Sequence, residues 1–218
     1  MSRSRRLLER QSGALDRALG MRFVREVGAG TISDRAYANY LLIEADFVRT
    51  AARLHGFAAW AAPSWAAVCR NGLALHALVT EQTDYFRATR AAWPVPARLA
   101  DGAGKRAERL ADFALDAART GGYPAIMTVL FAAETLYLTW CTRAQQAGSV
   151  PPGPVRDWVA MHAAEPFRAG VDALAEQVDQ IPSEVPDGEL DTWFSGMLAA
   201  EIAFHDTVFE GAVFEQPA

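Results

Sequence analysis

Apolar residues recur at spacings of three and four over most of the chain, which is the period of an α-helix that buries one face. Stretches of alternating apolar and β-branched polar residues, which are typical of strands, are nearly absent. Alanine, leucine, arginine and glutamate dominate instead, and these residues favour helices. The pattern therefore predicts an all-α protein.

Glycine, proline and capping residues between the apolar stripes predict where the helices begin and end. We expect helices over Arg5–Val27, from Ser33 or Asp34 to about Gly56, from Ser64 to the WPVP sequence at 93–96, over Lys105–Arg119, from Pro124 through Glu134, through Trp158, His162 and Glu165, and through Glu201. Gly121-Gly122 should separate the fourth helix from the fifth, and no loop exceeds about 12 residues. We therefore expect one domain over residues 1–218, a bundle of about seven or eight helices.

Three of the apolar stripes carry a glutamate in an interior position. The stripes are Tyr37, Tyr40, Glu44 and Phe47; Met127, Leu130, Glu134, Tyr137 and Cys141; and Phe194, Leu198, Glu201, His205 and Val208. A buried carboxylate costs several kcal/mol of desolvation unless it is paired or hydrogen-bonded. One such residue is commonly a half-buried carboxylate bonded to a neighbouring tyrosine or arginine. Three on separate helices favour a shared polar pocket.

Composition narrows the class of protein. Hydrophobic residues make up 51% of the 218 residues, and the formal net charge is −5. No basic patch interleaved with aromatic residues is present, so we expect no nucleic-acid partner. No run approaches the roughly 20 apolar residues of a membrane span, and the start of the chain continues as an amphipathic helix, so we expect a cytoplasmic protein without membrane contact. Cys69 and Cys141 are isolated in apolar helical contexts, which predicts buried free thiols and neither a disulfide nor a zinc site.

Four segments together resemble the TenA family, the thiaminase II-like proteins of thiamin salvage. YANYLLIEADF resembles that family's FxxYLxQDxxY segment, VLFAAETLYLTW its LLPCxxxY segment, WVAMHAAEPF its WIxxYxSxEF segment, and AAEIAFHD its terminal YExxFW. The segments occur in the family's order and cover most of the chain from the second helix onward. The resemblance implies a haem-oxygenase-like helical bundle and a homotetramer.

The chain also departs from the family pattern. The family's aspartate that binds the aminopyrimidine ring falls on Glu44, and the aromatic residue three positions later is Phe47 instead of tyrosine. The catalytic cysteine falls on Ala133, and a tyrosine expected earlier falls near Leu110. A glutamate directly after the missing cysteine, here Glu134, is similar to a branch of the family linked to free or N-formylated aminopyrimidines from thiamin breakdown.

The resemblance implies hydrolysis of a C–N bond on an aminomethyl- or N-formylaminomethyl-pyrimidine without a cysteine nucleophile and without a cofactor. Paired carboxyl groups in a desolvated cleft can supply both base and acid. We assign Glu134 as base or nucleophile and Glu201 as proton donor, with Tyr137 orienting Glu201 or the leaving group. Glu44 accepts hydrogen bonds from the pyrimidine amine. The substrate-binding set is completed by Phe47 and Tyr40, which stack on the ring, and by His162, which falls on a tyrosine of the family and is either a pocket residue or a core histidine.

Two alternatives remain open at this stage. Related haem-oxygenase-like bundles include di-iron oxidases, and Glu201 with His205 at i, i+4 could bind metal together with Glu44, Glu81 and Glu134, although no Glu-x-x-His pair occurs. The other alternative is a non-catalytic pyrimidine-binding or regulatory protein. Separately, Trp60 and Trp65 flank Pro63 in an alanine-rich segment, which favours a homo-oligomer, tetramer or dimer, that covers them.

Overall fold

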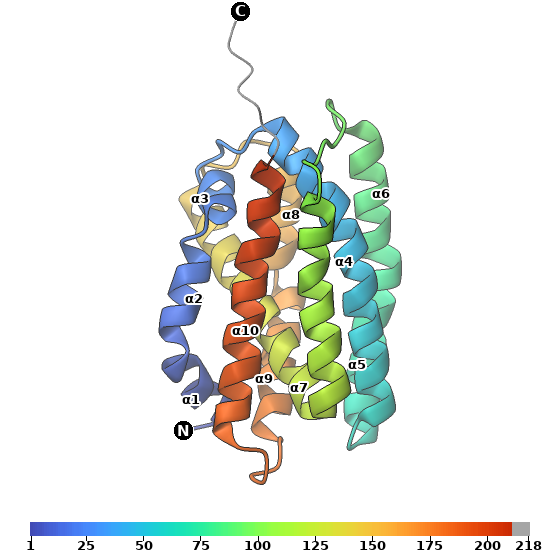
Figure 1. Ribbon diagram of the computed structural model, residues 1–218, viewed down its shortest axis with the longest axis vertical. Coiled ribbons are helices and arrows are strands. Elements are labelled where there is room, and N and C mark those ends of the chain that lie inside the picture. The colour runs from blue at the N-terminus through green and yellow to red at the C-terminus, as the bar shows by residue number, and fades with distance from the viewer. Residues whose placement is uncertain (211–218) are drawn as a thin grey trace, which may run out of the picture.

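Helices follow the apolar stripes through residues 1–210, the part of the chain that the computed structural model describes, and no strand occurs in that range (Figure 1). They are α1 (Arg3–Arg10), α2 (Ser12–Leu19), α3 (Arg22–Gly28), α4 (Asp34–Ala61), α5 (Trp65–Ala77), the π-helical turn η1 (Leu78–Gln82), α6 (Thr83–Ala92), α7 (Ala103–Ala147), α8 (Pro154–Ala163), α9 (Glu165–Asp179), α10 (Asp187–Asp206) and the 3-10 turn η2 (Thr207–Phe209). The all-α prediction is confirmed.

The longest helix, α7, lies at the centre of the bundle and packs against α4 on one side and α10 on the other (Figure 1). Gly122 interrupts it with φ 59° and ψ −146°, a conformation that glycine adopts far more readily than other residues. Pro124 stands just beyond, in the first turn after the kink, where its missing N–H leaves no helical bond broken. The predicted separation at Gly121-Gly122 is therefore confirmed as a kink that joins two helices.

Serine caps set the start of two helices as predicted. The Ser33 side chain accepts a hydrogen bond from the backbone N–H of Ala36 at 3.2 Å, at the start of α4. Ser64 accepts one from the N–H of Ala67 at 3.3 Å and begins α5 directly after the break at Pro63. The end of α4 differs from the expectation, because its buried stripe continues to Ala58 and the helix runs on to Ala61.

The single helix expected over residues 5–27 is wrong. The chain forms three short helices instead, with breaks at Gln11 and at Gly20-Met21, where Met21 is extended (φ −64°, ψ 155°). The breaks let the segment follow the surface, so that α1 contacts α9 and α10 while α3 contacts α7 and α10. Arg3 fixes the start through a 2.9 Å ion pair with Asp187 and bonds to the carbonyl oxygens of the loop before α10.

A second expected helix is also divided. The stripe through Trp158 and His162 ends with α8 at Ala163, because Ala164 is extended (φ −73°, ψ 158°) and the chain turns into α9. Glu165 therefore begins a new helix and does not share a face with His162. Pro166, in the first turn of α9, is the signal in the sequence for this boundary.

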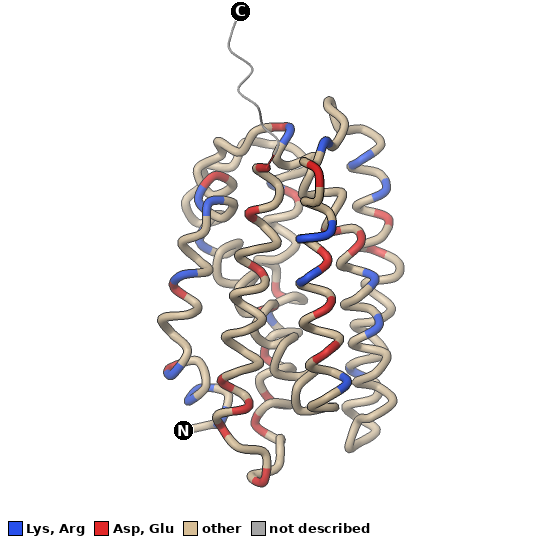
Figure 2. Tube along the Cα trace, in the orientation of Figure 1, with Lys and Arg blue, Asp and Glu red and all other residues tan. Residues whose placement is uncertain are grey.

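The buried half of α7 is apolar enough to be compared with a membrane span. It contains an 18-residue window of mean hydropathy 1.3 and, within the described chain, is the one helix that meets such a criterion by length and composition. However, 78% of this window is buried inside the bundle. The apolar sequence is accounted for by its position in the core. Charged residues of both signs are interspersed along the helices that surround it (Figure 2).

Close packing at the kink gives a test of the fold. A Cβ atom added at Gly121 would overlap the Trp193 ring and the Ala125 side chain, so we expect Gly121→Ala to lower the free energy of unfolding by about 1–3 kcal/mol. At Gly56, inside α4, an added Cβ meets no atom within 4 Å, and Gly56→Ala should raise stability by about 0.5–1 kcal/mol. Urea unfolding of the two variants beside the parent measures both. Equal stability of the two variants would contradict the packing at the kink.

Candidate active site

The three interior glutamates come from the three helices at the centre of the bundle. Glu44 on α4 is 6% exposed and Glu201 on α10 is 1% exposed, while Glu134 on α7 keeps a small exposed area. The negative charges of Glu44 and Glu134 both raise the pKa of Glu201, and Glu134 raises that of Glu44. The structure therefore brings the three carboxyl groups within electrostatic reach of one another.

Tyr137 lies at the centre of the hydrogen bonds around these groups. Its hydroxyl oxygen is 3.3 Å from Oε2 of Glu44, 3.3 Å from the Tyr40 hydroxyl and 3.2 Å from Nε2 of His205. No bond from Tyr137 to Glu201 is formed, and the carboxyl group that Tyr137 contacts is that of Glu44. Its other expected role, orienting the leaving group, stays a prediction. One hydroxyl thus connects α4, α7 and α10.

The environment separates the acidities of the three glutamates. Burial raises the pKa of Glu134 to about 7. Burial raises the pKa of Glu44 to about 8, with a smaller upward effect from Glu134 and a downward effect from the Tyr137 hydrogen bond. The pKa of Glu201 is raised well above its ordinary value, first by burial and then by Glu44 and Glu134. Glu134 is therefore more acidic than Glu44, and burial favours the protonated form of Glu201.

Glu201 carries a fully buried carboxyl oxygen without a hydrogen-bond partner. This atom is Oε2, and Nδ1 of His205 lies 3.5 Å from it. That nitrogen already donates to the backbone carbonyl of Glu201 at 2.8 Å. A buried polar atom without a partner is uncommon in folded proteins and marks a place where a ligand or water is expected to bond.

The predicted aromatic residues fall into two groups. Phe47 on α4 is partly exposed and packs against Phe204 with ring centroids 5.9 Å apart, so part of its ring is free to contact a ligand. Tyr40 is fully buried, and its ring packs against Phe23 at 4.6 Å and His205 at 5.7 Å. These neighbours occupy the ring of Tyr40, which leaves its hydroxyl as the part that serves the site.

His162 is a core histidine that contacts the site through Tyr137. It is 3% exposed, its Nδ1 donates to the Trp158 carbonyl oxygen at 2.9 Å, and its ring lies 5.3 Å from that of Tyr137. Burial lowers its pKa to about 4, so the ring is neutral at physiological pH. Of the two interpretations left open, the geometry favours packing beneath Tyr137 over direct contact with a charged ligand.

The thiols take no part in the site. Cys141 is fully buried, and burial together with Glu134 raises its pKa well above the ordinary value, so no nucleophilic thiolate forms there. Cys69 lies on the exposed side of α5, which corrects the expectation that it is buried, and both cysteines are free. Ala133 and Leu110 are buried apolar residues at the positions where the resemblance would place a cysteine and a tyrosine.

The geometry does not form the metal site that was considered as an alternative. Within residues 1–210 no three His, Cys, Asp or Glu side chains converge closely enough to hold a metal ion. Glu81 is exposed in η1. Both ring nitrogens of His205 are engaged, one by the Glu201 carbonyl and one by Tyr137. The contact between Tyr137 and His205 is the functional feature that sequence reasoning missed, because it joins two helices that are distant in the sequence.

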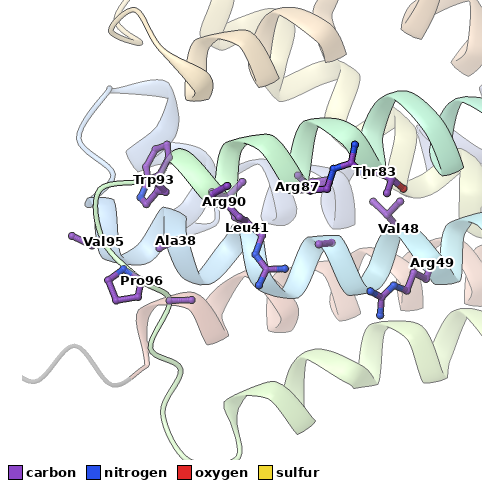
Figure 3. Close-up of a pocket in the computed structure, with 14 residues that line it drawn as sticks. Ala38, Leu41, Val48, Arg49, Thr83, Arg87, Arg90, Trp93, Val95 and Pro96 are labelled. Carbon is purple, nitrogen blue, oxygen red and sulfur yellow. The ribbon is translucent and has the colours of Figure 1, made fainter.

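A surface groove of about 590 Å³ lies apart from this cluster, between α4, α6 and the segment 93–97 (Figure 3). Arg49, Arg87 and Arg90 border it, and two of them form ion pairs with aspartates of their own helices. None of the three interior glutamates lines the groove. The carboxyl cluster therefore belongs to the bundle interior, and the groove is a separate surface feature.

The fold and the carboxyl cluster define an all-α bundle with a candidate acid–base site in its interior, and solved structures share that fold. A TenA homologue from P. horikoshii OT3 matches with a TM-score of 0.80 at 15% identity, covering 96% of this chain and 99% of that one. A TenA homologue from Pyrococcus furiosus matches with 0.81 at 15% identity, over 95% and 100%. A TenA family transcription regulator from Silicibacter sp. TM1040 matches with 0.79 at 16% identity, over 93% and 94%. No family model and no curated protein matches the chain. At these identities the likeness establishes the fold.

Proposed function

We propose that this protein is a cytoplasmic member of the TenA family that hydrolyses a C–N bond of an aminomethyl- or N-formylaminomethyl-pyrimidine in thiamin salvage. Three lines support the proposal: the four TenA-like segments of the sequence, the shared fold, and the interior carboxyl cluster. The observation that carries it is the buried, unpartnered Oε2 of Glu201 beside two further carboxyl groups. Such an oxygen is suited to bond a polar ligand that enters the bundle.

The acidities assign the chemical roles. Glu134, with a pKa of about 7, is partly ionised at neutral pH and takes a proton from water as general base, or attacks directly as the nucleophile. In the water route, the new C–O bond forms at the methylene carbon while its C–N bond breaks. Glu201, whose pKa burial raises well above its ordinary value, donates its proton to the leaving nitrogen. Free aminomethylpyrimidine then yields the hydroxymethyl product and ammonia.

Substrate recognition is assigned to α4. Glu44 faces the amine of the pyrimidine, and Phe47, with its partly exposed ring, stacks on the heterocycle. Tyr40 and His162 act through Tyr137 and do not touch the substrate themselves. Both contact Tyr137, and the rings of both are buried by other side chains. Tyr137 in turn fixes Glu44. All the expected residues keep a place in the site. Tyr40, which we expected to stack on the ring, serves the site through its hydroxyl group instead.

The proposal is tested by incubating the pure protein with aminomethylpyrimidine and, separately, with its N-formyl derivative. Formation of the hydroxymethyl product with ammonia, or of aminomethylpyrimidine with formate, identifies the bond that is cleaved. Glu201→Gln, which keeps the shape of the side chain but cannot donate a carboxylic proton, is the matched control and should form no product. If calorimetry shows that the parent binds either compound but cleaves neither, a non-catalytic pyrimidine-binding protein replaces the hydrolase.

We further propose that the protein is a homo-oligomer through the ends of α4 and α5. Trp60 at the end of α4 is 92% exposed and Trp65 at the start of α5 is 78% exposed. Phe57 on α4, Leu73 on α5 and Val79 in η1 are also exposed, by 50%, 72% and 52%. Large exposed apolar side chains mark interaction surfaces where they form a patch. The TenA-like segments imply a second copy of the chain as the partner, in a tetramer or a dimer.

We expect the double variant Trp60→Glu/Trp65→Glu to be monomeric. Association would bury its two new carboxylates against the partner without a cation to pair with them. Light scattering coupled to size exclusion measures the mass. Gln145→Glu with Gln146→Glu adds the same charge at exposed positions of α7 outside the patch and should leave the assembly intact. A parent protein that is monomeric at all concentrations would contradict the assignment of this surface.

A further inference from the structure

The two nitrogens of His205 fix where the hydrogen atoms of the cluster lie. Nδ1 is 2.8 Å from the Glu201 carbonyl oxygen, which can only accept, so Nδ1 carries a hydrogen. The ring is fully buried, and burial lowers its pKa to about 4, so the imidazole is neutral and Nε2 holds a lone pair. Nε2 is 3.2 Å from the Tyr137 hydroxyl, which must therefore donate its hydrogen to it.

This assignment determines the state of Glu44. Tyr137 has a single hydroxyl hydrogen, and once it is donated to His205 the other two contacts must be donated to the Tyr137 oxygen. The Tyr40 hydroxyl supplies one of them at 3.3 Å. Glu44, also at 3.3 Å, can supply the other only in its protonated form. The network of four side chains is therefore fully satisfied when Glu44 is neutral.

An ionised Glu44 requires a different arrangement. A carboxylate only accepts, so Tyr137 must turn its hydrogen to Glu44, and Nε2 of His205 then loses its donor. In a fully buried ring that loss is expensive unless Nε2 itself gains a proton and donates to the Tyr137 oxygen. The state of Glu44 is thus coupled to the state of His205 through one hydroxyl group.

We propose that Tyr137 relays a proton between Glu44 and His205, and that His205 is the positioning residue that lets Glu44 become a carboxylate when an amine-bearing heterocycle binds. This inference rests on the proposed function for the nature of the ligand. The Glu44 O–H bond breaks as a new O–H bond forms at Tyr137. The original Tyr137 O–H bond breaks as N–H forms at Nε2 of His205. No net charge enters or leaves the bundle, and no co-reactant is required.

The relay also reaches the proposed acid. An imidazolium at His205 places a positive charge 3.5 Å from the unpartnered Oε2 of Glu201. A nearby positive charge favours the carboxylate, so it makes Glu201 a stronger acid. The carboxylate that the same step creates at Glu44 acts in the opposite direction, because a negative charge at Glu44 raises the pKa of Glu201. The relay therefore places one charge of each sign beside the proposed acid.

The titratable neighbours of the relay define the controls. They are Tyr37 and Tyr40 on α4, Glu134 and Cys141 on α7, His162 on α8 and Glu201 on α10. Burial raises the pKa values of Tyr37, Tyr40 and Cys141 well above their ordinary values, and these three stay protonated through neutral pH. Glu134 is the neighbour that titrates nearest to Glu44, so Glu134→Gln is the matched control.

The test follows the ¹⁵N resonances of His205 in the full-length protein, labelled at histidine and assigned with His205→Gln. The relay predicts a neutral Nδ1–H ring near pH 6.5 and a shift of the Nε2 resonance around pH 8, where Glu44 ionises and Tyr137 turns away. Because the pKa of His205 itself is about 4, a purely structural ring shows no change there. The step should disappear in Tyr137→Phe and in Glu44→Gln and remain in Glu134→Gln.

The relay is overturned if the Nε2 chemical shift of His205 does not change around pH 8 in the parent. It is also overturned if that change persists in Glu44→Gln or Tyr137→Phe, or if it is lost in Glu134→Gln. If Tyr137→Phe does not fold, Glu44→Gln decides alone. Adding aminomethylpyrimidine at pH 7 should protonate both ring nitrogens of His205. A compound that binds and leaves His205 neutral overturns the ligand-driven step. A compound that does not bind at all contradicts the proposed function, while the pH step in the free protein still tests the relay.

Discussion

Glu134→Gln is expected to lower kcat for aminomethylpyrimidine hydrolysis by ~10²–10⁴, the contribution of a general base to such a reaction. The carboxyl group of Glu134 has a pKa of about 7, so it is substantially ionised at neutral pH. Glutamine has nearly the same shape and cannot accept the proton. Steady-state kinetics by product formation measures kcat, and calorimetry with the pyrimidine measures binding separately.

Binding of the ring should survive in Glu134→Gln, because recognition is assigned to Glu44 and Phe47 on another helix. Cys141→Ala is a matched control on the same face of α7, two turns further on, and it should keep the parent rate because its thiol is buried and protonated. A Glu134→Gln protein with parental kcat contradicts the role of Glu134. Loss of activity in Cys141→Ala would point to thiol chemistry instead.

Local signals in the sequence predicted much of the fold. Ser33 and Ser64 cap α4 and α5 as expected, and the kink of α7 falls at Gly121-Gly122, because a capping hydroxyl and a positive φ are requirements of single positions. The three helices of the first 28 residues were not predicted. Their breaks at Gln11 and Met21 depend on how the segment packs against α7, α9 and α10, which a periodic pattern does not contain.

The site was predictable to the level of which residues point inward. The spacing placed Glu44, Glu134 and Glu201 on buried stripes, and the structure brings their carboxyl groups within electrostatic reach. Their pairing was not predictable. Tyr137 bonds Glu44 and His205 because of the rotation of α7 against α4 and α10, a relation between distant segments that helical periodicity leaves open.

Glu44→Gln is expected to remove part of the loss of stability that the protein shows as the pH rises above neutrality. In the unfolded chain a glutamate has a pKa near 4.3, whereas folding raises the pKa of Glu44 to about 8. The folded state therefore binds more protons than the unfolded state between these values, and stability falls as the pH rises through this window. Replacing the carboxyl group by an amide removes that term.

The fall in stability with rising pH is clearest above about pH 7.5. Below that pH, His162 and His205, whose folded pKa values are lowered to about 4, contribute in the opposite direction, because the unfolded chain takes up their protons and stability falls as the pH falls. Above about pH 7.5 the histidines are neutral in both states, and over the range from pH 6.5 to 8.5 Glu44 by itself accounts for a loss of about 2 kcal/mol. Glu134 adds a smaller loss over the same range, since its folded pKa is about 7.

Urea unfolding at fixed protein concentration, at pH 6.5, 7.5 and 8.5, measures the difference in slope between the parent and Glu44→Gln. We expect the parent to lose more stability than the variant over this range, by about 2 kcal/mol. The slope is the informative quantity, because the amide also changes the hydrogen bond to Tyr137 and shifts stability equally at every pH. Glu9→Gln, which alters an exposed glutamate of α1, should keep the parental slope. Equal slopes in the parent and in Glu44→Gln would mean that Glu44 is ionised throughout, and that the neutral carboxyl group on which the hydrogen-bond network depends is not formed.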